Sequence, residues 1–142
     1  MKKATKLQLE LERGMLASEA SFLNIISAAT RRANEHFWRD VKTNKRLRNR
    51  NKGEMYMLMV SELAEAFEAV RKSKVETMMD KHLPEYPAEV VELADQYIRM
   101  MDFVGEYYGD MFGMAVEAKR AYNTTRKDHT REHRMAPGGK AF

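Results

Sequence analysis

Apolar residues recur at three- and four-residue spacing along most of the chain, which is the pattern of amphipathic helices. Two prolines, at 84 and 87, interrupt this pattern near the middle, because proline is excluded from helix interiors. The pattern predicts four helices, over residues 18–37, 54–72, 87–108 and 111–128. Four helices with short connections in a chain of this size predict an all-α four-helix bundle.

The composition agrees with one helical domain. The chain has 142 residues, of which 44% are hydrophobic and 32% charged, and only seven are glycine and three proline. This length allows one domain with a modest core and is too short for two ordinary ones. We therefore expect residues 1–142 to form a single domain, with polar tails at about 1–17 and 130–142 that lie at its periphery.

Cysteine is absent, which excludes disulfides and thiolate metal sites. The basic start of the chain is not followed by the apolar core of a signal peptide, and no segment approaches the roughly 20 apolar residues of a membrane span. We expect a cytoplasmic protein without a membrane partner. The formal net charge is only +4, which alone does not indicate a nucleic-acid-binding protein.

The second predicted helix carries a carboxylate on its apolar face. Each residue of a helix advances by about 100°, so Met55, Met59 and Ala66 all project within about 60° of Glu62. Glu65 falls at the edge of the same stripe. A carboxylate on a core-facing stripe is costly unless it is paired or binds a metal.

The third predicted helix has a second acidic pair, Glu92 and Asp95. Both lie on a charged side that also contains Arg99, Asp102 and Glu106, opposite an apolar side. Such a helix is ordinary, and its charged side is expected to face solvent.

The two acidic pairs are stronger evidence for a site when they are considered together. If the second and third helices pack antiparallel, Glu62 and Glu65 face Glu92 and Asp95. Four converging carboxylates cannot all stay ionised at neutral pH without a cation. Oxygen ligands favour a hard ion, Mg²⁺ with Mn²⁺ as a substitute. Structural salt bridges are the alternative, and Arg99 or an arginine at position 71 could supply one.

The spacing Glu62-x-x-Glu65, then 26 residues, then Glu92-x-x-Asp95 resembles the ExxE…ExxD signature of the MazG-like nucleoside triphosphate pyrophosphohydrolases. The surrounding segments GEMYMLMVSELAEAFEAVR and PAEVVELADQYIRMMDF resemble the second and third helices of that family. The likeness covers about residues 20–142. Ser61 is a departure, because many members have a glutamate there.

The resemblance implies Mg²⁺-dependent hydrolysis of ribo- or deoxyribonucleoside triphosphates between the α and β phosphates, giving a monophosphate and pyrophosphate. It assigns Glu62, Glu65, Glu92 and Asp95 as metal ligands and catalytic residues. It also implies a homodimer or homotetramer. Base preference, sugar preference, the number of metal ions and the identity of the general base stay open.

Two further groups of residues are candidates for substrate binding. On the fourth predicted helix, polar residues with i, i+3, i+4 and i+7 spacing form one face that suits a polyphosphate, although such a face is often only solvated. They are Lys119, Tyr122, Asn123 and Arg126. At the end of the first helix, Trp38 could stack on a base and Asn34 could bond its edge. Packing of Trp38 in the core is an equal alternative.

Two other functions compete with the enzyme. Six lysines and arginines between residues 42 and 52 could contact nucleic-acid phosphates, although no aromatic residue is interleaved with them and the acidic third helix would repel a duplex. We therefore expect no nucleic-acid partner. The chain could also be a helical protein-interaction module whose acids form only salt bridges.

Overall fold

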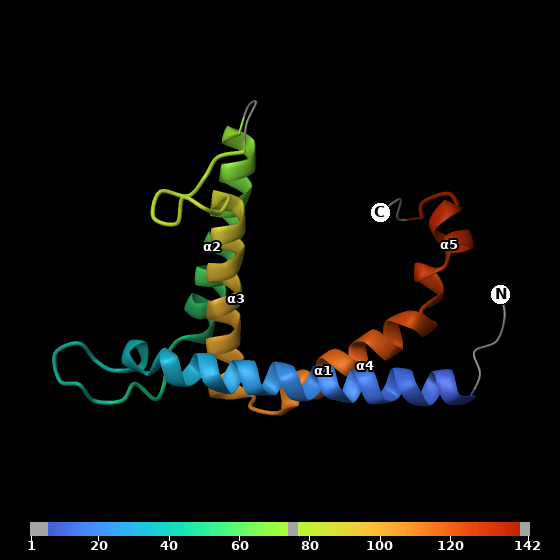
Figure 1. The fold of residues 1–142 in the computed structure, drawn as a ribbon, viewed down its shortest axis with the longest axis horizontal. Helices are drawn as coiled ribbons and strands as arrows, with labels where there is room; N and C mark the ends of the chain where they lie inside the picture. Colours follow the sequence, from blue (N-terminus) through green and yellow to red (C-terminus); the bar gives the residue numbers. More distant parts are fainter. Residues whose placement is uncertain (1–5, 74–76, 140–142) are drawn as a thin grey trace. The chain divides into compact units, whose positions relative to one another are not determined.

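The computed structural model describes residues 6–73 and 77–139. Within these residues the regular secondary structure is helical, apart from two isolated β-bridges (Figure 1). The all-α class is therefore confirmed. The α-helices are α1 (Lys6–Ala33), α2 (Lys52–Lys72), α3 (Ala88–Tyr107), α4 (Met111–Thr125) and α5 (Arg131–Met135). Two short 3₁₀ helices, η1 (Glu35–Trp38) and η2 (Lys127–His129), follow α1 and α4. No helix among the described residues is long and apolar enough to cross a membrane.

The ends of α2 and α3 follow from local chemistry. Asn51 caps α2, because its side-chain oxygen accepts hydrogen bonds from the backbone N–H groups of Gly53 and Glu54, at 2.9 and 3.4 Å. Pro87 directly precedes α3. Both boundaries lie within two residues of the predicted ones.

The prediction was less accurate at α1 and at the C-terminal tail. α1 begins at Lys6 instead of residue 18, and it ends at Ala33, after which the chain tightens into η1. The expected polar tail contains α5, which begins after Thr130. The hydroxyl of Thr130 accepts a hydrogen bond from the backbone N–H of His133, so this helix has its own cap.

The chain divides into two compact units, which are described separately. One contains residues 26–109, and the other contains residues 1–25 and 110–142. The single-domain expectation for the whole chain stays a prediction.

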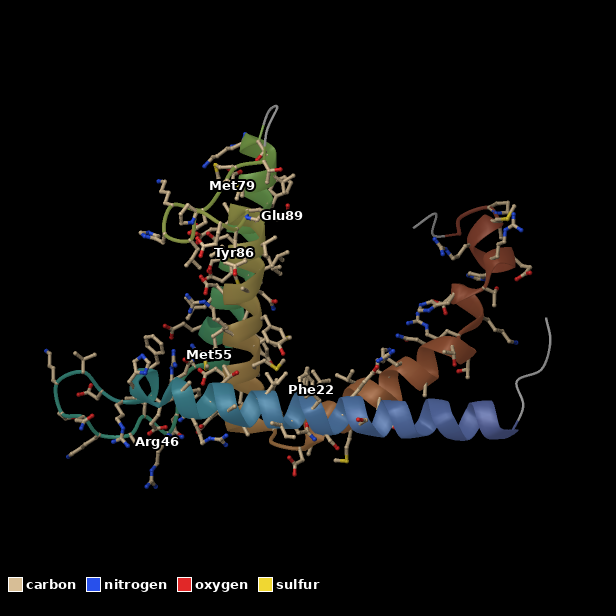
Figure 2. All side chains as sticks on the ribbon, viewed as in Figure 1. Phe22, Arg46, Met55, Met79, Tyr86 and Glu89 are labelled. Carbon is tan, nitrogen blue, oxygen red and sulfur yellow. The ribbon has the colours of Figure 1, made fainter. Side chains whose placement is uncertain are left out.

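In the unit of residues 26–109, α2 and α3 form an antiparallel hairpin (Figure 1). The rings of Tyr56 and Phe103 lie 4.9 Å apart, and Glu62 pairs with Arg99 further along. As the residue number rises in α2, that of its partner in α3 falls, which is the antiparallel register. Met55, labelled in Figure 2, lies in the first turn of α2 and is buried.

α3 packs against the rest of its unit through the predicted apolar side over its last turns, where Met101 is 1% exposed, and departs from the prediction elsewhere. Its expected apolar side is largely exposed near the start of the helix, where Val90, Leu93 and Tyr97 are 49%, 43% and 38% exposed. Asp102, assigned to the solvated side, is only 6% exposed. The prediction of a solvated charged face was therefore wrong at Asp102, because this carboxylate has a buried partner, which is described below.

The last turns of α1 pack closely on α3 at Gly105. A Cβ atom at this position would lie 2.5 Å from the backbone oxygen of Ser27 and 2.9 Å from the Cβ of Arg31. Arg31 also donates to Glu106 and Glu35, at 2.5 and 2.6 Å. A small residue and a set of ion pairs therefore fix this helix crossing.

In the other unit, α4 packs on the first part of α1 through a second glycine. The side chain of Asn24 accepts a hydrogen bond from the backbone N–H of Gly113 at 2.9 Å and donates to the backbone oxygen of Asp110 at 3.0 Å. Arg120 of α4 forms an ion pair with Glu19 of α1. The asparagine thus provides an acceptor for the N–H of Gly113, one of the first N–H groups of α4, which have no acceptor within the helix.

We expect the substitution Gly105→Ala to lower the free energy of unfolding by about 1–3 kcal/mol, because the added methyl group would overpack the backbone of α1. Urea denaturation followed by circular dichroism would measure the change. Gly14→Ala is the matched control. Its Cβ meets no atom within 4 Å, so it should stabilise the helix by about 0.5–1 kcal/mol. Equal stability of the two variants would contradict the close packing at Gly105.

Candidate metal centre

Three carboxylates from α2 and α3 converge on one point. Glu62, Glu65 and Glu92 each offer an oxygen atom, and these oxygens all lie within 4.8 Å of one another. Glu62 is buried, Glu92 is half-buried and Glu65 is exposed, so the group opens to solvent on one side. The antiparallel hairpin creates this convergence, since residues 27 to 30 positions apart in sequence come to face one another.

The expected place of Glu62 on the apolar stripe of α2 is confirmed. Its neighbours on that stripe, Met55, Met59, Ala66 and Ala69, are each at most 9% exposed, and Glu62 itself is 6% exposed. Such a carboxylate requires an opposite charge. Arg99 supplies one, because its Nε atom lies 2.7 Å from Oε1 of Glu62.

Within this group, the folded structure shifts the pKa of Glu92. Burial raises the pKa of the Glu92 carboxyl, and the negative charges of Glu65, Glu62 and Asp95 raise it further. Ionised Glu92 is therefore disfavoured in the folded protein. A cation bound between the carboxylates would offset the cost of burying the charge on Glu92 and the repulsion from the neighbouring carboxylates. The group therefore has the chemistry of a metal site.

Asp95, the fourth predicted ligand, is exposed and lies outside the group of converging oxygens. It lines a cavity of about 320 Å³ next to that group. Arg99 also lines this cavity and forms the ion pair with Glu62. The cavity and the acidic group therefore share this residue. The remaining lining residues are Asn34, Phe37, Arg50, Met55, Leu58, Met59, Ile98 and Asp102.

Asn34 lines this cavity, and its contact with a substrate stays a prediction, whereas Trp38 is not part of the cavity wall. Trp38 has no exposed surface, and its indole N–H donates to both carboxylate oxygens of Asp102, at 2.9 and 3.1 Å. The guanidinium groups of Arg31 and Arg50 lie 4.7 and 4.9 Å from the centre of the Trp38 ring. The structure favours the packing alternative for Trp38, because no face of its ring is open to a base.

Sequence reasoning missed Asp102 as a wall of the cavity. Burial is the main cause that raises the pKa of its carboxyl, while the Trp38 hydrogen bond and the charges of Arg31 and Arg50 act in the opposite direction. One signal was available in the sequence. Asp102 stands between Met101 and Phe103 in a helix, and a lone tryptophan elsewhere in the chain required a partner for its N–H group.

The polar face predicted on α4 belongs to the other unit. Lys119 lies over the ring of Tyr122, at 5.0 Å from its centre. Arg126 is already paired with Asp128, and mainly through this hydrogen bond it lowers the pKa of that carboxyl to about 2, well below its usual range. The Oδ1 atom of Asn123 is buried and has no hydrogen-bond partner among the residues that the structure describes. The role of these four residues in phosphate binding stays a prediction.

Several cations of the segment 42–52 are engaged within their own unit. Arg46 pairs with Glu35 and Glu106, at 2.5 and 2.7 Å. Arg50 lies over Trp38, and Lys52 lies over the ring of Tyr107 at 4.2 Å. Half of the six cations therefore have internal partners, which weakens the case for a nucleic-acid interface.

Comparison of the chain with protein-family models, curated proteins and solved structures finds no match to any of them. The case for a function therefore depends on the residues themselves. The carboxylate oxygens suit a hard divalent cation, and the neighbouring cavity combines apolar walls with an amide, two guanidinium groups and two carboxylates.

We expect Glu92→Gln to raise the free energy of unfolding at pH 7 in the absence of divalent ions. The folded protein disfavours ionised Glu92, so its charge costs stability at neutral pH, and this cost disappears as the pH falls through the raised pKa. Urea denaturation at pH 7 and at pH 4 would show the gain at the higher pH only.

Glu89→Gln is the control for this experiment. Glu89 is exposed in the first turn of α3, where a negative charge is favourable, so its removal should slightly destabilise the protein at pH 7. Loss of stability in Glu92→Gln at pH 7 would contradict the repulsion between the carboxylates.

Proposed function

We propose that the protein hydrolyses ribo- or deoxyribonucleoside triphosphates at the α–β phosphate bond, with Mg²⁺ or Mn²⁺ as the cofactor. One observation carries the proposal. Three carboxylates from two antiparallel helices meet beside a cavity that shares Arg99 with them. A metal group next to a half-open, partly apolar cavity suits a substrate with a phosphate chain at one end and a heterocycle at the other.

Glu62, Glu65 and Glu92 would hold the metal, and Asp95 is the proposed fourth ligand on the cavity side. A divalent ion held there would supply charge stabilisation for the phosphate and a lowered pKa for water. The carboxylates would hold the ion beside the cavity, next to Arg99. Glu65 is the exposed member of the three, so it is available to accept a proton from water.

The cavity would bind the nucleoside part of the substrate. Its volume of about 320 Å³ lies at the lower end of the range for small-molecule sites. Leu58, Met59 and Ile98 give it apolar walls, and the amide of Asn34 can donate to and accept from the edge of a base. In this arrangement the phosphates of the substrate would lie near Arg99, and its base would lie near Asn34, just after α1.

The likeness of the motifs to the MazG-like family supports the same reaction. In this chain the two motifs have the spacing of that family, and the structure brings three of the four motif carboxylates together. A family of enzymes that cut the α–β bond with these acids gives a specific expectation for the products, namely a nucleoside monophosphate and pyrophosphate.

Incubation of the full chain with Mg²⁺ and a panel of nucleoside triphosphates, followed by ion-exchange separation, tests the reaction. We expect monophosphate and pyrophosphate in equal amounts. Glu62→Gln should lower the rate by at least about 100-fold, a typical loss when a group that supports transition-state charge is removed. Glu68→Gln is the control, since Glu68 lies on the same helix and pairs with Arg71. Release of diphosphate and phosphate, or no turnover with Mg²⁺ or Mn²⁺, would contradict the proposal.

We also propose that the protein works as a homodimer or homotetramer. A stripe of exposed apolar side chains follows one side of α2, and contiguous apolar surface of this kind is typical of subunit contacts. Its members are Met57, Val60, Leu63, Phe67 and Val70, each between 46% and 65% exposed.

Phe67→Glu should lower the mass measured by sedimentation equilibrium, because the charge would be buried at the contact. Met135→Glu, on α5 and 71% exposed, is the control. A wild-type chain that sediments as a monomer would contradict the assembly.

A further inference from the structure

We infer that Arg99 is the resident counter-ion of the acidic group, that a divalent cation displaces it from Glu62, and that the freed guanidinium becomes a phosphate-binding group in the cavity. The inference rests on the proposed metal site. It adds a coupling between metal binding and substrate binding, and it assigns Arg99 as a substrate-binding residue.

The choice of Arg99 follows from the contacts of the two candidate arginines. Arg71 donates through Nε and Nη2 to Glu68, at 2.7 and 2.8 Å, and thereby serves a carboxylate outside the acidic group. Arg99 instead reaches Glu62 from α3, with Nε at 2.7 Å from Oε1. Arg99 is thus the arginine whose charge is placed against a member of the three converging carboxylates.

The two partners of this ion pair differ in burial. The side chain of Glu62 is 9% exposed, whereas that of Arg99 is 43% exposed. A buried carboxylate cannot lose its counter-ion without a large cost, because an unpaired charge in the interior is strongly destabilising. The half-exposed guanidinium can leave at little cost, because water solvates it. The exchange of one cation for another at Glu62 therefore depends on Arg99 moving and Glu62 staying in place.

A divalent ion between the three carboxylates would be close to the guanidinium of Arg99. Two positive charges in contact repel each other, and the repulsion is stronger in a partly buried place than in water. The metal also supplies the positive charge that Glu62 requires. Both effects favour the departure of Arg99 when the metal binds.

Arg99 has a place to go, because it already lines the cavity beside Asp95. A guanidinium freed from a carboxylate presents a planar fork of N–H donors, which binds phosphate oxygens in pairs. Metal binding would thus create the phosphate site. Because coupling between two ligands is reciprocal, a bound phosphate chain would hold Arg99 away from Glu62 and tighten metal binding.

Calorimetric titration with Mn²⁺, without nucleotide, tests the competition. We expect Arg99→Met to bind Mn²⁺ about three- to tenfold more tightly than the wild type, a change that corresponds to the strength of one partly exposed ion pair. Arg71→Met is the matched control. It removes the same charge from an exposed pair that does not touch the acidic group, so the affinity should stay within about twofold of the wild type.

A double-mutant cycle without metal gives a second readout. Arg99→Met should lower the midpoint of thermal unfolding in the wild-type background and leave it unchanged in a Glu62→Gln background, because the coupling between the two residues is then already lost. Saturating Mn²⁺ should restore the midpoint of Arg99→Met, since the metal replaces the missing counter-ion.

The outcomes separate the inference from the proposed function. Mn²⁺ binding that is equal or weaker in Arg99→Met would overturn displacement and leave the metal site standing. No Mn²⁺ binding to any of the proteins would overturn both. Tighter binding in Arg99→Met with no hydrolysis of any nucleotide would support the competition and contradict the reaction.

Discussion

Two buried carboxylates that each require a partner determine how the helices pack in the unit of residues 26–109. Glu62 on α2 and Asp102 on α3 are each 6% exposed. Each is matched by a donor from another element, Arg99 for Glu62 and the indole of Trp38 for Asp102. Because an unpaired buried charge is strongly destabilising, these two contacts select which faces of α2, α3 and η1 meet. The cavity and the acidic group lie on either side of Arg99 as a result.

Much of this arrangement could be predicted from the chain alone. The spacing of apolar residues, together with the proline before α3, was sufficient to place the starts of α2 and α3 within two residues. The position of Glu62 on the apolar stripe follows from helix geometry, and the hairpin then determines which residues of α3 face it. Three of the four predicted ligands meet for this reason.

The remainder depended on contacts that periodicity does not encode. α3 has apolar and charged residues on both of its sides, and the choice between them depends on α1 and η1, which pack on it through Gly105 and Asp102. The bond from Trp38 to Asp102 joins residues 64 positions apart, so the sequence signals at the two positions do not identify these residues as partners of each other. The polar face of α4 lies in the other unit, and the helical spacing of its residues carries no information about what that face binds.

The burial of Trp38 has a spectroscopic consequence. It is the only tryptophan of the chain, so its fluorescence is free of overlap from any other indole. Two guanidinium groups lie over the ring, which also bonds to Asp102, and both Asp102 and Arg50 line the cavity. A charged ligand in the cavity, next to Asp102 and Arg50, would change the electric field at this indole without touching it. The protein therefore contains its own optical reporter of ligand binding, and no label has to be attached.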